Sequence, residues 1–346
     1  MAAISGTVYR DYAEGVRIDA ETGYAAGAVE TDAISLGQVT SISATWTDNV
    51  GRQLGIGEGR NETLYNYGTI DISGSIDWNV LAQMATTDGS SIGFMKFFFG
   101  SVSGSGTTAA PYEISEEDNI DYTNMYSFAI YAQNESGTTD DVDLYEGCVA
   151  NSISLTAAQG DILKASMDWT AKQVTCNTSI TTAYSAPTDA PWGFQQGTFK
   201  WGATPSAVAG VSSFTLTCNN SPFTFYSMGS RFIEKPEYGR RLYDFTLTCK
   251  MTSDVATTLR DNLFGQANSF TTGIDPSTLT ADYEIALEFA EGGSSGDKVM
   301  HILLDQCALS AMSKAVPVGQ GLVEVTFTGF AKQGKSNNPI KYYTTT

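Results

Sequence analysis

Few residues of this chain have types and spacing that could support chemistry. A single histidine, His301, stands between the apolar residues Met300 and Ile302. An imidazole can act as a general base or as a metal ligand, but one histidine cannot form a multi-histidine metal centre. We interpret His301 as a partly buried structural residue.

Glu284 and Glu288 could form a carboxylate pair, because residues four apart on a strand share one face. Glycoside hydrolysis requires two such facing carboxylates, so a jelly-roll glycosidase is kept as an alternative. The glycine-rich stretch from Gly55 to Gly59 has neither the G-x-x-x-x-G-K-[ST] spacing of a phosphate-binding loop nor a strand–turn–helix frame. We therefore predict that the protein is not an enzyme and uses no cofactor.

Two acidic runs, residues 116–118 and 140–143, have the oxygen ligands that a hard cation such as Ca²⁺ prefers. They lack the spacing and the loop glycine of an EF-hand, so we interpret them as solvated loops and predict no metal site. Five cysteines at dispersed positions include no C-x-x-C pair. This spacing argues against zinc and favours buried thiols in a reducing compartment.

The charge balance excludes further classes of protein. Lys and Arg total 19 against 38 Asp and Glu, which gives a net charge of −19 over 346 residues. Binding to nucleic acid needs clustered cations, so we expect no specific DNA or RNA binding. No apolar run approaches the ~18 residues of a membrane-spanning helix, and residues 1–10 lack the pattern of a secretory signal. We expect no membrane partner.

The elements that position these residues are mainly strands. Alternating apolar and polar residues, with Ser and Thr on the polar side, predict strands. They cover residues 40–46, 69–77, 149–155, 162–169, 213–218, 242–251, 283–289, 299–304, 308–312 and 322–330. Residues 158–160 are expected to turn a hairpin. Short helices are predicted over residues 77–84 and 253–264, and loops over 100–111, 133–141 and 183–191.

Similar segments recur in the same order and predict an internal duplication. Residues 41–46 resemble 213–218, and the segment from Cys148 to Gln173 resembles the segment from Cys307 to Gln333. Leu64-Tyr65 and Leu242-Tyr243 precede similar strands in the two halves.

The duplication predicts five parts of the chain. Two β-sandwich modules, each with one short α-helix, cover residues 35–178 and 192–335. Residues 179–191 form a linker, residues 1–34 an N-terminal arm and residues 336–346 a C-terminal tail. The predicted fold class is therefore mainly β with two tandem modules.

The stretch from Gly147 to Lys172 resembles the tail tube (major tail) proteins of tailed phages and archaeal tailed viruses. It contains a Gly-Cys-x-x-Asn-Ser strand, a turn at Gly160 and an alternating second strand that closes on an Ala-Lys pair. The second module departs from this pattern, since no Asn-Ser follows Cys307.

This resemblance implies a structural virion protein whose sheets join those of neighbouring subunits into a ring-wide inner β-barrel. Stacked rings would form the hollow tail tube that delivers viral DNA into the host. An acidic chain agrees with this function, because like charge keeps DNA from adhering to a lumen. Ring closure also removes exposed sheet edges. The implied place is the tail of the virion, after assembly in the host cytoplasm.

The resemblance also implies partners: further copies of the chain, the tape-measure protein, the baseplate and the tail terminator protein. A chain with two modules predicts a homotrimeric ring with pseudo-sixfold symmetry. A hexameric ring with the second module outside is the alternative. The candidate lumen-lining hairpins carry Ile153, Leu155, Ile162, Trp169, Leu309, Leu322 and Phe327.

Two arginines, Arg60 and Arg231, lie at nearly the same place in the two modules and are candidate intersubunit contacts. Two further functions stay open. The first is another β-rich virion component, such as a decoration or baseplate protein. The second is a carbohydrate-binding adhesin with a sugar platform formed by Tyr65, Tyr67, Trp192 and Trp201.

Overall fold

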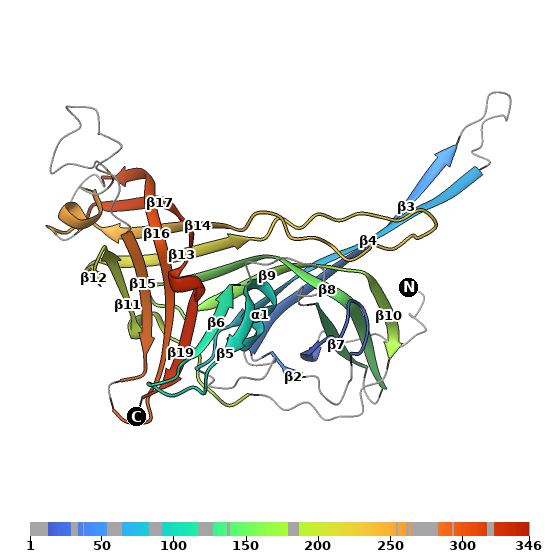
Figure 1. Cartoon of the computed structure of the whole chain (residues 1–346), viewed down its shortest axis with the longest axis horizontal. Coiled ribbons are helices and arrows are strands. Elements are labelled where there is room, and N and C mark those ends of the chain that lie inside the picture. Colours follow the sequence, from blue (N-terminus) through green and yellow to red (C-terminus); the bar gives the residue numbers. More distant parts are fainter. Residues whose placement is uncertain are drawn as a thin grey trace, which may run out of the picture.

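Long antiparallel strands dominate the computed structural model (Figure 1). The chain is mainly β, because its alternating residues place apolar side chains on one face of each strand. The structure describes residues 13–28, 34–36, 38–53, 64–82, 92–116, 127–136, 139–178, 187–253, 255–260, 263, 283–292, 294–316 and 322–345.

A central sheet crosses both halves of the chain. Its strands follow the order β3–β4–β9–β8–β13–β14–β17–β16, and all neighbours are antiparallel. The bounds are β3 Gln38–Gln53, β4 Leu64–Asn79, β8 Thr139–Ala158, β9 Lys164–Ala171, β13 Val211–Asn219, β14 Leu242–Lys250, β16 Lys298–Ala315 and β17 Glu324–Ala331. Within the described residues this sheet is open, with β3 at one edge and the end of β16 at the other.

The two longest strands, β8 and β16, each take part in two sheets. The C-terminal part of each lies in the central sheet, and the N-terminal part lies in an outer sheet. Gly147 and Gln306, with φ of +66° and +52°, mark the places where the two strands change sheet. Each half therefore has a second layer that can cover the central sheet.

The outer sheet of the first half runs β2–β1–β7–β8–β10. The outer sheet of the second half runs β12–β11–β15–β16, and β16 also pairs with β18 and β19. β19 continues through β6 to β5. The bounds are β1 Ala13–Ala20, β2 Ile34–Ser35, β5 Gly100–Ser103, β6 Tyr112–Glu116, β7 Phe128–Ser136, β10 Gln173–Thr178, β11 Gly197–Gly202, β12 Ser206–Ala207, β15 Tyr283–Ala290, β18 Gln333–Gly334 and β19 Ile340–Thr344.

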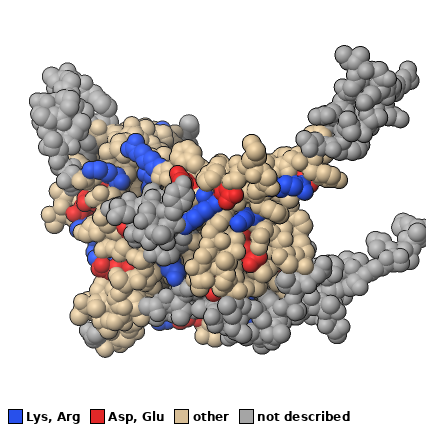
Figure 2. All heavy atoms as spheres, turned by 45° about the vertical axis from the view of Figure 1, so that its right-hand side comes forward, with Lys and Arg blue, Asp and Glu red and all other residues tan. Residues whose placement is uncertain are grey.

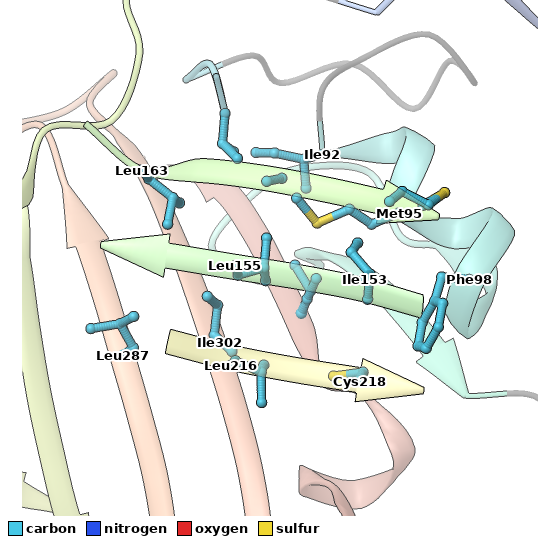
Figure 3. Close-up of a cluster of buried hydrophobic side chains, with 14 of the residues drawn as sticks. Ile92, Met95, Phe98, Ile153, Leu155, Leu163, Leu216, Cys218, Leu287 and Ile302 are labelled. Atoms are coloured by element: carbon cyan, nitrogen blue, oxygen red, sulfur yellow. The ribbon is translucent and has the colours of Figure 1, made fainter. Parts of the chain in front are cut away.

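The core fills the space between the central and the outer sheets. Aromatic pairs join the layers: Phe199 of β11 packs 5.8 Å from Phe214 of β13, and Trp201 packs 6.1 Å from Phe245, measured between ring centroids. One buried cluster continues through both halves. Figure 3 shows its middle part, where Ile153 and Leu155 of β8 lie beside Leu216 and Cys218 of β13.

Helices are short and only partly follow the prediction. The helix predicted over residues 77–84 is wrong throughout its described part, because Asp77 to Asn79 belong to β4, with Trp78 in the core, and residues 80–82 form no helix. Residues 83–84 lie outside the described residues. In the first half, the helical turns lie further along the chain than predicted. In the second half, the helix predicted over residues 253–264 is confirmed for one π-helical segment. These elements are the 3-10 turn η2 Gly93–Met95, α1 Lys96–Phe99 and η4 Val255–Arg260. Two further 3-10 turns are η3 Phe194–Gln196 and η6 Lys335–Asn337.

The strand predictions hold for the central sheet, but one loop prediction is wrong and another begins four residues too early. Residues 133–141 belong largely to the β7–β8 hairpin, and β5 already begins at Gly100. The hairpin turn at residues 158–160 is confirmed, since the amide of Asp161 donates to Ala158 O at 3.0 Å. The strands predicted over 299–304 and 308–312 are one strand, β16.

The described parts of both terminal segments pair within the chain. β1 pairs with β7, and β19 pairs with β16 and β6. Residues 187–190 of the predicted linker have no regular structure.

Candidate assembly surface

One face of the central sheet is lined by hydroxyl side chains. Along each strand these alternate with side chains that point into the core, so they share the opposite face. This hydroxyl face comprises Ser41, Ser43, Thr45, Ser73, Ser75, Ser152, Ser154, Thr156, Ser166, Thr170, Thr215, Thr217, Thr246, Thr248, Thr326 and Thr328. Some of them bond across strands, such as Ser43 to Ser75 at 2.9 Å and Thr156 to Thr215 at 3.4 Å.

Charges on the hydroxyl face are few and mostly negative. Asp168 accepts a hydrogen bond from Ser152 at 2.6 Å, and Asp77 and Asp244 occupy two further positions. Lys250 is neutralised by Glu324, with 2.5 Å between Nζ and a carboxylate oxygen. Figure 2 shows the charged side chains of one side of the molecule scattered among uncharged residues. Among its described residues, the hydroxyl face therefore offers no cluster of cations to a phosphate backbone.

The residues predicted to mark the lumen-lining hairpins lie mainly on the core face. Ile153, Leu155, Trp169 and Phe327 are buried. Ile162 and Leu309 are half-buried, and Leu322 is 74% exposed. The predicted hairpins exist as β8–β9 and β16–β17. If these hairpins line a lumen, their hydroxyl side chains therefore face it.

The two halves of the central sheet share their irregularities. The β3–β4 register breaks at Thr40, and the β13–β14 register breaks at Ser212. Both side chains bond back across the strand pair: Thr40 donates to Asp77 O at 3.2 Å, and Ser212 donates to Thr248 O at 3.0 Å. β-bulges of this kind are specific structural features.

Two more bulges match. The β8–β9 register breaks at Asn151, and the β16–β17 register breaks at Ser310. In the outer sheets, β7–β8 breaks between Phe128 and Ile130, and β15–β16 breaks between Tyr283 and Ile285.

A cross-strand pair of glycine and an aromatic ring also recurs, with the two members exchanged. Gly74 of β4 lies opposite Trp169 of β9, whereas Phe245 of β14 lies opposite Gly329 of β17. A Cβ atom at Gly74 would come within 2.4 Å of the Trp169 ring, and one at Gly329 would come within 2.4 Å of the Phe245 ring. Each ring thus occupies the space that a missing side chain leaves.

The outer edges of the central sheet expose apolar side chains. On β3, Trp46 is 51% exposed, although it shares the core face with its buried partner Ile72. Just beyond β16, Val316 is 65% exposed. An exposed strand edge with apolar residues favours pairing with another strand.

Beyond the central sheet, the β3–β4 hairpin extends as a first arm, and the β13–β14 connection, residues 220–241, runs alongside it as a second arm (Figure 1). Arg231 joins them. It contacts Asp48 at 2.6 Å, donates to Gly68 O at 2.9 Å and lies over the Tyr67 ring. These contacts are within one chain, and Arg60 lies outside the described residues.

Tyr226 forms a second contact between the arms by donating to the Asp71 carboxylate. Burial and this carboxylate raise the pKa of Tyr226 to about 12, so the phenol keeps its proton near neutral pH.

The base of the second arm holds a buried polar group that the sequence did not single out. The Asn220 side chain donates to Phe98 O at 3.0 Å, and Arg241 donates to Phe99 O and to Asn220 Oδ1, both at 3.0 Å. These bonds fix α1 of the first half to the second half. The signal in the sequence is weak, since an isolated Asn and Arg carry no periodic pattern.

Comparison with known families decides which class of protein this surface belongs to. The family described as phage tail tube protein matches residues 66–331, more than half of the chain. The chain belongs to the phage tail tube protein family. No curated protein matches it. Membership makes this a structural protein of the virion tail that self-assembles into a tube with other tail proteins.

In this tail tube protein, the residues considered for chemistry serve the fold. Glu288 pairs with Lys200 at 2.5 Å, and Glu284 pairs with Lys335. Trp192 and Trp201 are buried in the core, so they cannot form a sugar platform. The side chain of Tyr65 lies outside the described residues.

Glu116 of the first acidic run is also used within the tail tube protein, since it accepts hydrogen bonds from Tyr243 and from the amide of Gly334. The side chains of 117–118 and 140–141 lie outside the described residues. In the described part of the chain, no group of three His, Cys, Asp or Glu side chains could hold a metal ion.

Four of the five cysteines, Cys148, Cys218, Cys249 and Cys307, are buried, and Cys176 is exposed. Burial raises the pKa of Cys249 and of Cys307 to about 12, so both remain thiols. Across the ranges given above, no helix is long and apolar enough to cross a membrane.

Proposed function

We propose that this protein polymerises as stacked rings into the hollow tail tube and that its hydroxyl face lines the lumen through which viral DNA passes. The observation that carries the proposal is the hydroxyl face itself. Most of its side chains are short and uncharged, and its two described lysines, Lys164 and Lys250, are each paired with a carboxylate, so a duplex can slide past without binding.

We further propose that the chain is a tandem duplication, with modules at residues 35–178 and 192–335, a linker at 179–191, an arm at 1–34 and a tail at 336–346. The matched bulges at Thr40 and Ser212, and at Asn151 and Ser310, support this origin. Strand pairs of independent origin would not be expected to carry bulges at corresponding positions.

A duplicated module favours a ring of three chains. Each chain supplies two sets of four strands to the central sheet, so three chains supply six sets and a pseudo-sixfold ring. The sheets of neighbouring chains would join into one inner β-barrel without free edges. A ring of six chains with the second half outside is the competing arrangement.

The remaining assignments follow from this function. Assembly takes place in the host cytoplasm, and the finished tube meets the tape-measure protein, the baseplate and the tail terminator protein. Arg60 is proposed as a contact between subunits. Arg231 would act at the same interface indirectly, by holding the second arm against the first.

Electron microscopy of the purified protein tests the proposal. Samples at rising concentration and salt should show tubes or stacked rings with a central hole. A protein that remains a single small particle under every condition would contradict self-assembly by this chain.

A further inference from the structure

We propose that the end of β16 pairs antiparallel with β3 of the next copy of this chain, with Trp46 opposite Met312 and Thr45 opposite Ser313. This inference rests on the proposed tube function and specifies the strands and the register of the seam between subunits. The partner is therefore a second copy, bound through the two open edges of the central sheet.

The register follows from a junction that the chain already contains. Where the two halves meet, β8 pairs with β13, and Cys218 lies opposite Ile153, Thr217 opposite Ser154, and Leu216 opposite Leu155. In the sheet order, β8 ends the first set of four strands and β13 begins the second. β16 ends the second set, so the strand that would follow it is a β3.

The bulges give the residue correspondence. Counting from Thr40 and Ser212, Trp46 takes the place of Cys218 and Thr45 the place of Thr217. Counting from Asn151 and Ser310, Met312 takes the place of Ile153 and Ser313 the place of Ser154. Transfer of the β8–β13 register then sets Trp46 against Met312, Thr45 against Ser313, and Ala44 against Lys314.

The side chains at the two edges fit this register. On the core face, Trp46 meets Met312 and Ile42 meets Val316, which covers the exposed apolar surface of these residues, and Ala44 meets Lys314 between them. On the hydroxyl face, Thr45 meets Ser313, which continues the row of hydroxyls across the seam. A shift of one residue would set apolar side chains against hydroxyls.

The edges are also available. In the described residues, β3 pairs with β4 alone, and the end of β16 pairs with β17 alone. Both strands thus present an unpaired row of backbone groups on the side away from the sheet. The antiparallel direction of β8 and β13 is preserved when β16 and β3 take their places.

Paired cysteines test the register in assembled tubes. In a Cys176→Ser background, we would build Thr45→Cys with Ser313→Cys, and Ala44→Cys with Lys314→Cys. The two pairs lie on opposite faces, so one of them occupies the closer, non-hydrogen-bonded kind of position. Directly opposite residues have Cα separations that a disulfide accepts.

The controls re-pair the same four substitutions, as Thr45→Cys with Lys314→Cys and Ala44→Cys with Ser313→Cys. Their side chains point to opposite faces of the seam. After mild oxidation of tubes verified by microscopy, covalent oligomers should form about tenfold faster from the opposite pairs than from the re-paired controls.

The outcomes separate this inference from the function on which it rests. Tubes in which the controls cross-link as fast as the opposite pairs, or in which neither opposite pair cross-links, would overturn the register and leave the tube function standing. A chain that forms no tubes would overturn both.

Trp46 gives a second readout that needs no new cysteine. The other four tryptophans, Trp78, Trp169, Trp192 and Trp201, are buried, so Trp46 dominates quenching of fluorescence by acrylamide. Assembly should reduce the quenching of this fluorescence severalfold in the natural chain. In a Trp46→Phe variant, assembly should leave the quenching unchanged. Equal quenching before and after assembly would place Trp46 outside the seam and overturn the proposal.

Discussion

The first strands of the two halves, β3 and β13, occupy corresponding places in the central sheet but differ in their surroundings. Cys218 of β13 is fully buried because β8 lies beside it, whereas Trp46 of β3 is 51% exposed because that side is open. The exposure of β3 therefore reflects an absent neighbour and not a different kind of strand. We propose that this edge, which would be a liability in a monomer, is the means of assembly.

The same substitution at the two corresponding positions should break different processes. Cys218→Glu places a charge in the core and should destabilise folding by roughly 3–5 kcal/mol. Trp46→Glu places the charge at an open edge, so folding stability should change by about 1 kcal/mol or less, while tube formation is lost. Denaturant unfolding and sedimentation of assembled material measure the two effects.

A polar control sharpens this comparison. Thr45→Ser keeps a hydroxyl on the hydroxyl face and should leave both folding and sedimentation unchanged. The distinction between the inner junction and the outer edge is wrong if Trp46→Glu unfolds the chain as strongly as Cys218→Glu does.

The glycine–aromatic pairs test whether the halves are built alike. Gly74→Ala and Gly329→Ala would each push a Cβ to within 2.4 Å of an aromatic ring, and overpacking of this kind costs about 1–3 kcal/mol. We expect similar losses for both, measured by thermal unfolding. Gly23→Ala, whose nearest neighbour would be 4.0 Å away, is the matched control. A large loss at only one of the two glycines would contradict the correspondence.

The contact between the two arms should contribute less. The Arg231–Asp48 pair is about two-fifths exposed on both sides, and exposed ion pairs contribute about 1 kcal/mol or less. We expect Arg231→Ala to lower the free energy of unfolding by about that amount. A double-mutant cycle with Asp48→Ala isolates the pair, and a coupling far above this value would show a buried interaction.

The smallest expected effect is on the pH dependence of stability. It comes from His301, which lies in the outer sheet of the second half. Burial lowers the pKa of His301 below 6.5, which the Glu288 carboxylate opposes and Lys200 and Lys341 reinforce. The folded state then binds the proton less well than the unfolded chain, so stability is lost as pH falls below 6.5. His301→Gln should flatten the dependence of Tm on pH between 5 and 7 by a small amount. An unchanged slope would show that other groups dominate.

The sequence predicts the central sheet well because its strands alternate strictly. Residues 213–218 and 242–250 lie in strands with buried Phe214 and Leu247 on one side and mainly Ser or Thr on the other. The helix predicted over 77–84 fails because Asp77 resembles a helix cap locally, whereas Trp78 completes the alternation of β4 in the core. Tertiary burial outweighs the local preference there.

The assembly surface is harder to predict than the strands. The named hairpins exist, but Ile153 and Trp169 point into the core, since apolar residues mark the buried face of a strand. The partner of Arg231 could not be predicted because Asp48 is far away in the sequence. Periodicity gives the face of a strand but not its distant neighbour.

Cryo-electron microscopy of assembled tubes tests the central claim most directly. We expect rings of three chains in which both halves contribute their hydroxyl face to one continuous inner sheet, with Trp46 of each chain beside Met312 of the next. Rings of six chains, with the second half outside the inner sheet, would contradict this account.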